Sequence, residues 1–181
     1  MIRIREPDLG KEALDSLIVE LAEITADKAL LMCNFRNSNQ LERNLALGIH
    51  YPEMIPREMF PANLRLEERV VGRSIHSMET ALDFNKAPVD YLTYGTVFAS
   101  KTHPGGPIQG LQNLAQIVGA SIRPILAIGG IQANNVAEVM STGAYGISVI
   151  GSISEAKVPL DVTKELVEIA NLNFSRIKMD D

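Results

Sequence analysis

The sequence is poor in cysteine and in long apolar runs. Its only cysteine, Cys33, lies inside the apolar run Ala29–Cys33 and has no partner for an internal disulfide, so we expect an inert, buried thiol in a reducing cytoplasm. No apolar run is long enough to span a bilayer, and no secretion signal is found. The net charge is −5, from 17 basic and 22 acidic residues, without a basic block. These features favour small-molecule partners over nucleic acid or a membrane.

Groups that commonly carry catalysis are also scarce. The three histidines, His50, His76 and His103, are scattered along the chain without the spacing of metal ligands. No carboxylate pair stands at the predicted strand ends. We expect His50 and His76 to be hydrogen-bonded residues near strand ends, whereas His103, in a loop, is the better candidate for proton transfer.

The sequence does contain seven short, largely apolar runs, each followed by a helical or irregular crossover. The predicted strands are Met1–Arg5, Ala29–Cys33, Gly48–Tyr51, Val70–Ser74, Val89–Tyr94, Pro124–Ile128 and Gly146–Ile150. The predicted helices are Gly10–Ala26, Gln40–Leu47, Met78–Phe84, Ile108–Val118, Gln132–Ser141 and Val158–Phe174. Such alternation is typical of parallel α/β folds.

This pattern predicts a (β/α)8 TIM barrel of which seven βα units are present. The chain begins directly on a strand, so we expect the first strand–helix unit to be absent from this polypeptide. A doubly wound sheet is the alternative, but no G-x-G-x-x-G follows the first strand. We predict a single, incomplete barrel domain over residues 1–181 with a frayed end at Asp180-Asp181. Open strand edges favour self-association, by dimerisation or domain swapping.

Two glycine-rich turns follow the last two predicted strands. Gly129-Gly130 comes after Pro124–Ile128, and Gly151-Ser152 starts a helix after Gly146–Ile150. Glycine lets the backbone come close to a ligand, and backbone N–H groups at such turns bind anions. In TIM barrels the phosphate site is frequently built from the loops after strands seven and eight. We therefore predict a phosphate cradle at these two turns.

Polar residues after the other strands complete a candidate anion-binding rim, because active groups in barrels lie at the carboxyl ends of strands. These residues are Arg5, Glu6, Asn34, His50, Ser74, His76, Thr96 and the loop Ser100-Lys101-Thr102-His103. Ser100, Thr102 and Gly105-Gly106 are of the type that surrounds a phosphate or pyrophosphate. Arg5 can add a fixed charge with bidentate donors.

Four motifs, in order along the chain, resemble those of the thiamine phosphate synthase and thiazole tautomerase family. They are IRIRE, VVGRSIHSMETA, DYLTYGTVFASKT and ILAIGGIQANNVAEVMSTGAYGISVI. The resemblance covers almost the whole chain, and G-R-S-x-H-S is closer to the tautomerase branch. It implies a (β/α)8 barrel of slightly greater length than this chain.

The resemblance also implies roles for individual residues. Arg5 matches an arginine that contacts the pyrophosphate, Asn34 matches a family asparagine, and Ser74 matches the serine near the pyrimidine, with His76 in the same motif. Ser100 and Thr102 fit a T-x-T-K loop whose lysine is His103 here. Gly129, Gly130, Ile150 and Gly151 match the cradle for the thiazole phosphate.

Other positions depart from the family pattern. The two aspartates that bind magnesium in synthases fall at Phe35 and near Ile55, where Glu53 is the only carboxylate close by. Mg²⁺ is therefore an implied cofactor whose protein ligands are not matched. The histidine proposed to drive tautomerisation falls at Thr96.

The resemblance implies an enzyme of thiamine biosynthesis that couples a pyrimidine pyrophosphate to a thiazole phosphate. Arg5, Asn34 and His103 are its expected catalytic residues, and Ser74, His76, Thr96, Ser100 and Thr102 its expected binding residues. Thiazole tautomerisation is the alternative chemistry. Two hypotheses without catalysis also stand: a paralogue that binds the phosphorylated ligand without turnover, and a truncated copy with little function.

Overall fold

The computed structural model describes residues 1–6, 8–26, 28–34, 48–56, 58, 60, 70–101 and 104–177. The predicted helix Gln40–Leu47, the site residues Thr102 and His103, and the tail Asp180-Asp181 lie outside these ranges. The chain divides into two compact units. The first comprises residues 1–74 and 88–90, and the second comprises residues 75–87 and 91–181.

Within the described part of the first unit, four parallel strands form a sheet. They are β1 (Ile2–Ile4), β2 (Leu31–Asn34), β3 (Gly48–Tyr51) and β4 (Val70–Ile75), whose last residue belongs to the second unit. The register pairs Ile4 with Cys33, Asn34 with His50, and His50 with Gly72. Residues paired in this way point to the same face of a sheet, and neighbours along a strand point to opposite faces.

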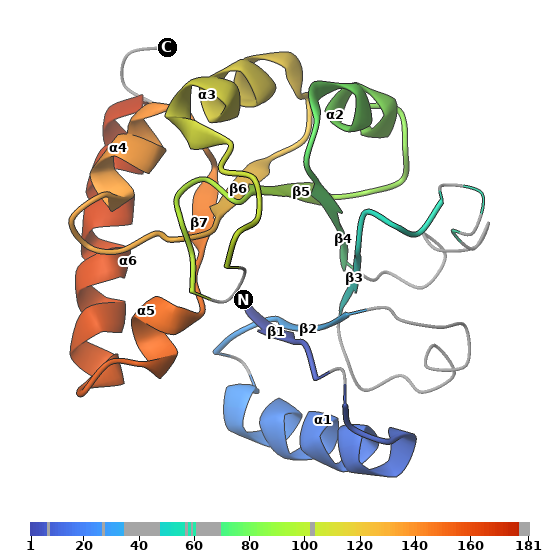
Figure 1. Cartoon of the computed structure of the whole chain (residues 1–181). Coiled ribbons are helices and arrows are strands. Elements are labelled where there is room, and N and C mark those ends of the chain that lie inside the picture. Colours follow the sequence, from blue (N-terminus) through green and yellow to red (C-terminus); the bar gives the residue numbers. More distant parts are fainter. Residues whose placement is uncertain are drawn as a thin grey trace. The chain divides into compact units, whose positions relative to one another are not determined.

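Helix α1 (Lys11–Thr25) covers one face of that sheet, as Figure 1 shows in blue. Ile4 and Leu31 of the sheet form a core cluster with Leu14 and Ile18 of the helix. The spacing of apolar residues in the predicted helix Gly10–Ala26 also predicts Ile24 on this apolar face. That prediction is wrong, because Ile24 is 61% exposed, on the last turn of the helix.

The described residues of the second unit form three parallel strands and five helices. The strands are β5 (Tyr91–Gly95), β6 (Ile125–Ile128) and β7 (Gly146–Ser148), and β6 pairs with both others. The helices are α2 (Met78–Phe84), α3 (Gly110–Ala120), α4 (Val136–Ser141), α5 (Gly151–Ser154) and α6 (Pro159–Ile177). Helix α6, red in Figure 1, contacts α4, α5 and β7. The core of this unit includes Leu92, Leu114, Ala127 and Val139, all fully or almost fully buried.

The seven predicted strands are all present, and two of the differences in element ends have a local cause. Strand β5 begins at Tyr91 rather than Val89 because the Asp90 side chain and main chain both bond to the backbone of Val71. Helix α4 begins at Val136 rather than Gln132, since the Asn135 side chain accepts a hydrogen bond from the Gln132 N–H and forms a turn first. No helix in the described part of the chain is long and apolar enough to cross a membrane.

Candidate functional site

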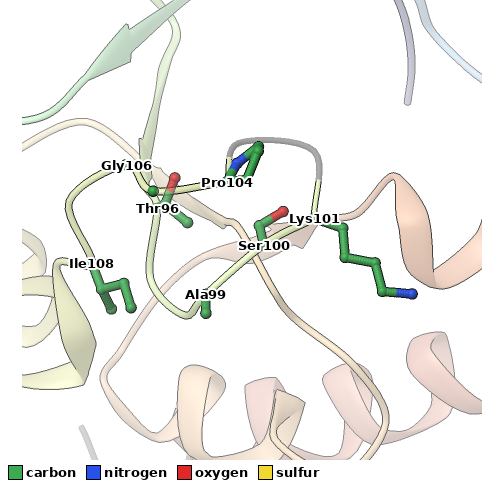
Figure 2. Close-up of a pocket in the computed structure, with 8 residues that line it drawn as sticks. Thr96, Ala99, Ser100, Lys101, Pro104, Gly106 and Ile108 are labelled. Carbon is green, nitrogen blue, oxygen red and sulfur yellow. The ribbon is translucent and has the colours of Figure 1, made fainter.

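Residues 96–101 and 104–108, which follow β5 and are called the cavity segment, line a cavity of about 340 Å³ in the second unit. Figure 2 shows that its wall comes from this one segment, and the lining residues are Thr96, Ala99, Ser100, Lys101, Pro104, Gly105, Gly106 and Ile108. The segment closes on itself, because the Thr96 carbonyl accepts from the Gln109 N–H at 2.8 Å and the Val97 carbonyl from the Gly110 N–H at 3.1 Å. The volume falls in the range of small-ligand pockets.

The turn Gly129-Gly130, after β6, packs directly against this segment. Both residues have positive φ, 105° and 64°, a region that side chains other than glycine rarely adopt. A Cβ on Gly129 would lie 2.5 Å from Thr96 Cγ2, and one on Gly130 would overlap the carbonyl oxygen of Ala99. The glycines therefore allow two backbone segments to touch, and the turn supports the cavity wall.

Helix α5 is linked to the same region by two side-chain contacts. Ser152 Oγ donates to the Ile131 carbonyl, just past the Gly129-Gly130 turn. Lys101 Nζ lies 3.0 Å from Glu155 Oε2, and both side chains are exposed. In Figure 2 the Lys101 side chain extends away from Thr96. Of the predicted cradle residues, Gly129 and Gly130 thus contact the cavity segment directly. Gly151 begins the helix α5 that is linked to it, and Ile150 is exposed.

His76 lies beyond the end of β4, and its Nδ1 bonds to the Gly95 carbonyl at the end of β5. A carbonyl oxygen only accepts hydrogen bonds, so Nδ1 carries the proton in the neutral ring. The bond joins His76 to the residue that precedes Thr96. The expectation that His76 is a hydrogen-bonded residue is confirmed.

The first unit holds the other predicted site residues. Arg5 is exposed just past β1, and Asn34 ends β2. Ser74 Oγ lies 2.9 Å from Nε2 of His50, which is buried. The Asn34 Oδ1 atom is buried and has no hydrogen-bond partner among the residues described. No donor among those residues therefore satisfies this oxygen.

Arg73 is a buried residue whose importance the sequence did not reveal. Its guanidinium donates to the carbonyls of Ile55 and Glu53, at 2.7 and 2.8 Å, and lies 5.3 Å from the centre of the Phe60 ring. Burial lowers the Arg73 pKa, and the nearby Glu53 charge opposes this shift. The alternation of side chains along β4 was the available signal, because it places Arg73 on the face opposite Ser74.

The described residues do not fit a magnesium site held by the protein. They contain no group of three or more His, Cys, Asp or Glu side chains that could hold a metal ion. Near Ile55, two backbone oxygens that could ligate a cation already accept from Arg73. Mg²⁺ needs near-octahedral oxygen ligands and is often bound jointly by carboxylates and substrate phosphates. We therefore derive no chemical step through a metal.

Cys33 is half-buried, and burial, followed by the negative charge of Asp15, raises its thiol pKa. Reactive cysteines have the opposite property, a lowered pKa that produces thiolate. The structure thus agrees with the expectation of an inert thiol, although its side chain is less buried than expected.

Parallel strands followed by helices, with polar residues after the strand ends, define an α/β protein of the TIM-barrel class. A sequence model described as thiamine monophosphate synthase matches residues 1–153. The chain belongs to the thiamine monophosphate synthase family.

Individual relatives agree with this assignment. A thiamine-phosphate synthase of Pyrococcus furiosus is 38% identical over 118 residues, which cover 65% of this chain and 56% of that protein. A thiamine-phosphate synthase of Pyrococcus abyssi is 30% identical over 171 residues, 93% of this chain and 81% of that protein. The structure of a thiamine phosphate pyrophosphorylase from P. furiosus aligns with a TM-score of 0.80 at 28% identity, covering 95% of this chain and 83% of that one.

The match to the first of these synthases spans little more than half of its length. The two sequence relatives are named thiamine-phosphate synthases, and the solved structure is named a thiamine phosphate pyrophosphorylase. The expected nearness to the tautomerase branch finds no support among them.

Proposed function

We propose that this chain couples a pyrimidine pyrophosphate to a thiazole phosphate. The thiazole nitrogen attacks the methylene carbon of the pyrimidine, a C–N bond forms, the C–O bond to pyrophosphate breaks, and pyrophosphate leaves. One observation carries the proposal: in a chain of this family, the segment after β5 lines a cavity with hydroxyl groups and packs against the Gly129-Gly130 turn. Preorganised donors around a leaving group lower the barrier because they need no rearrangement as charge develops.

In this proposal the second unit binds phosphate groups. Thr96 and Ser100 contribute hydroxyl groups from the cavity wall. The adjoining Thr102 and His103 are assigned from the sequence alone. Gly129, Gly130 and Gly151, with Ile150, remain the predicted cradle for the thiazole phosphate.

In the first unit, Arg5 supplies a permanent positive charge for the pyrophosphate. Asn34 helps to hold the same pyrophosphate through the donors of its side-chain amide, and Ser74 contacts the pyrimidine. These assignments make the reaction depend on hydrogen bonds and on arginine rather than on carboxylates of the protein.

The first experiment measures thiamine phosphate and pyrophosphate formed by the purified chain, with magnesium and with a chelator. We expect turnover, with a magnesium dependence that reflects metal carried by the pyrophosphate. Ser100→Ala should lower kcat/KM by about ten- to a hundredfold, since a hydrogen bond to a charged group contributes about 1.5–3 kcal/mol. Ser16→Ala, on the exposed face of α1, is the matched control and should leave the rate unchanged.

No turnover by a folded preparation would contradict the synthase proposal. Binding of the thiazole phosphate without turnover would then identify a ligand-binding paralogue. Isomerisation of the thiazole would identify a tautomerase instead.

A further inference from the structure

His50 and Ser74 share one face of the first unit's sheet. The register pairs His50 of β3 with Asn34 of β2 and with Gly72 of β4, and Ser74 follows Gly72 by two residues. These side chains therefore point to the same side. The opposite side carries Ile4, Leu31 and Cys33, which pack against α1. The face away from the helix thus gathers Asn34, His50 and Ser74 near the carboxyl ends of the strands.

The contact between His50 and Ser74 is specific. The Nε2–Oγ distance is 2.9 Å, and the His50 side chain is 1% exposed while Ser74 is half-buried. A buried polar group that loses its partner costs about 1–3 kcal/mol, so the two side chains remain paired. Because the His50 side chain is buried, packing also fixes the orientation of its imidazole ring. The ring in turn fixes the position of the Ser74 hydroxyl.

We propose that His50 is a positioning residue, whose imidazole holds the Ser74 hydroxyl in the orientation that recognises the pyrimidine ring of the substrate. This inference rests on the proposed function, which places Ser74 at the pyrimidine. Each ring nitrogen of a neutral imidazole is either a donor or an acceptor. When Nε2 accepts, the serine oxygen faces the ligand as an acceptor for an amino group; when Nε2 donates, the hydroxyl proton is left for a ring nitrogen.

The surroundings of His50 disfavour the other role of a serine–histidine pair, activation of a nucleophile. Burial, together with the positive charges of Arg3 in β1 and Arg73 in β4, lowers the His50 pKa to about 2. A general base works best with a pKa near the operating pH. A ring that stays neutral throughout the physiological range orients its partner but does not accept its proton.

The first test compares His50→Leu, His50→Gln, Ser74→Ala and the double variant His50→Leu/Ser74→Ala. We expect His50→Leu to raise KM for the pyrimidine pyrophosphate about tenfold, the value of one hydrogen bond, while KM for the thiazole phosphate is unchanged. His50→Gln, which keeps a polar atom near the Nε2 position, should keep KM for the pyrimidine pyrophosphate close to that of the unmodified chain. In the Ser74→Ala background, His50→Leu should raise this KM little further, because the hydroxyl that His50 positions is already gone.

Additive losses in the double variant, or equal rises in both KM values by a folded His50→Leu, would overturn the proposal. A circular dichroism melt establishes folding for each variant. If the chain shows no turnover, the same comparison is made with dissociation constants for the pyrimidine pyrophosphate, measured by calorimetry. Failure of the synthase activity is thereby separated from failure of this inference, and absence of pyrimidine binding by the unmodified chain also overturns it.

A second measurement does not require activity. Nitrogen NMR of the imidazoles should show His50 as a single neutral tautomer from pH 5.5 to 8, and Ser74→Ala should shift its Nε2 resonance. Titration of His50 near its usual pKa of 6.5, or no response to Ser74→Ala, would contradict the proposed pair.

Discussion

At the scale of single residues, Gly130 shows how one position serves both fold and site. Its φ of 64° is unfavourable for a residue with a side chain, and a Cβ would overlap the Ala99 carbonyl oxygen and lie 2.8 Å from Phe98 Cβ. Both neighbours belong to the segment that forms the cavity after β5. The need for glycine here comes from contact between two backbone segments.

We predict that Gly130→Ala lowers the free energy of unfolding by about 2 kcal/mol or more. A left-handed conformation costs about 1–2 kcal/mol for an L-residue, and displacement of backbone adds to this cost. Gly105→Ala is the matched control, because Gly105 has φ of 76° but open space around its Cα. Urea denaturation of both variants separates the two causes. Equal losses would show that backbone conformation alone requires glycine at position 130.

At the scale of secondary-structure elements, α2 begins with a side-chain cap at Ser77. Ser77 Oγ accepts from the Thr80 N–H at 3.1 Å and lies 2.7 Å from Thr80 Oγ1. The preceding residue is His76, whose ring bonds to Gly95. The cap therefore fixes the start of the helix directly after a predicted site residue.

Ser77→Ala should lower the free energy of unfolding by about 1 kcal/mol, the usual cost of losing an N-cap side chain. Ser77→Asp keeps an acceptor at the cap and places a negative charge at the helix start, so it should retain most of the stability. Thermal and urea denaturation measure the difference. If Ser77→Ala and Ser77→Asp are equally destabilised, the cap does not contribute as its geometry indicates.

At the scale of the whole molecule, a single buried ring makes stability depend on pH. The folded pKa of His50 is about 2, against 6.5 in an unfolded chain. The unfolded chain therefore binds a proton below pH 6.5 that the folded chain does not bind. The stability contributed by this difference is complete above about pH 6.5 and is lost progressively as the pH falls toward 2.

We predict that lowering the pH from 7.5 to 5 removes about 2 kcal/mol of unfolding free energy through His50 alone. Urea denaturation at the two pH values measures the total change. His50→Gln cannot take up this proton, so its loss between the same pH values should be smaller by about that amount. Identical pH dependences in the two proteins would show that His50 does not stay neutral in the folded chain.

Much of the fold could be predicted because its signals are local. Strand β3 and helix α2 have the predicted bounds, since a short buried run and a capped helix are each specified by adjacent residues. Helix ends that depend on a turn side chain, such as Asn135 before α4, were placed less accurately. The exposure of Ile24 could not be read from periodicity, because exposure depends on tertiary packing and not on spacing within the helix.

The sequence by itself determined the order of strands and helices and the motifs of the family, and it supplied the candidate site residues, whose roles stay predictions. Tertiary structure alone decided which of these residues touch. His50 and Ser74 are 24 positions apart, and Lys101 and Glu155 are 54 apart. The register of parallel strands brings the first pair together, and packing of a loop against a helix brings the second. Local sequence specifies the element to which a residue belongs and the face on which it lies. Contacts between distant segments depend instead on how the elements pack. The pairing of His50 with Ser74 is therefore visible only in the folded chain.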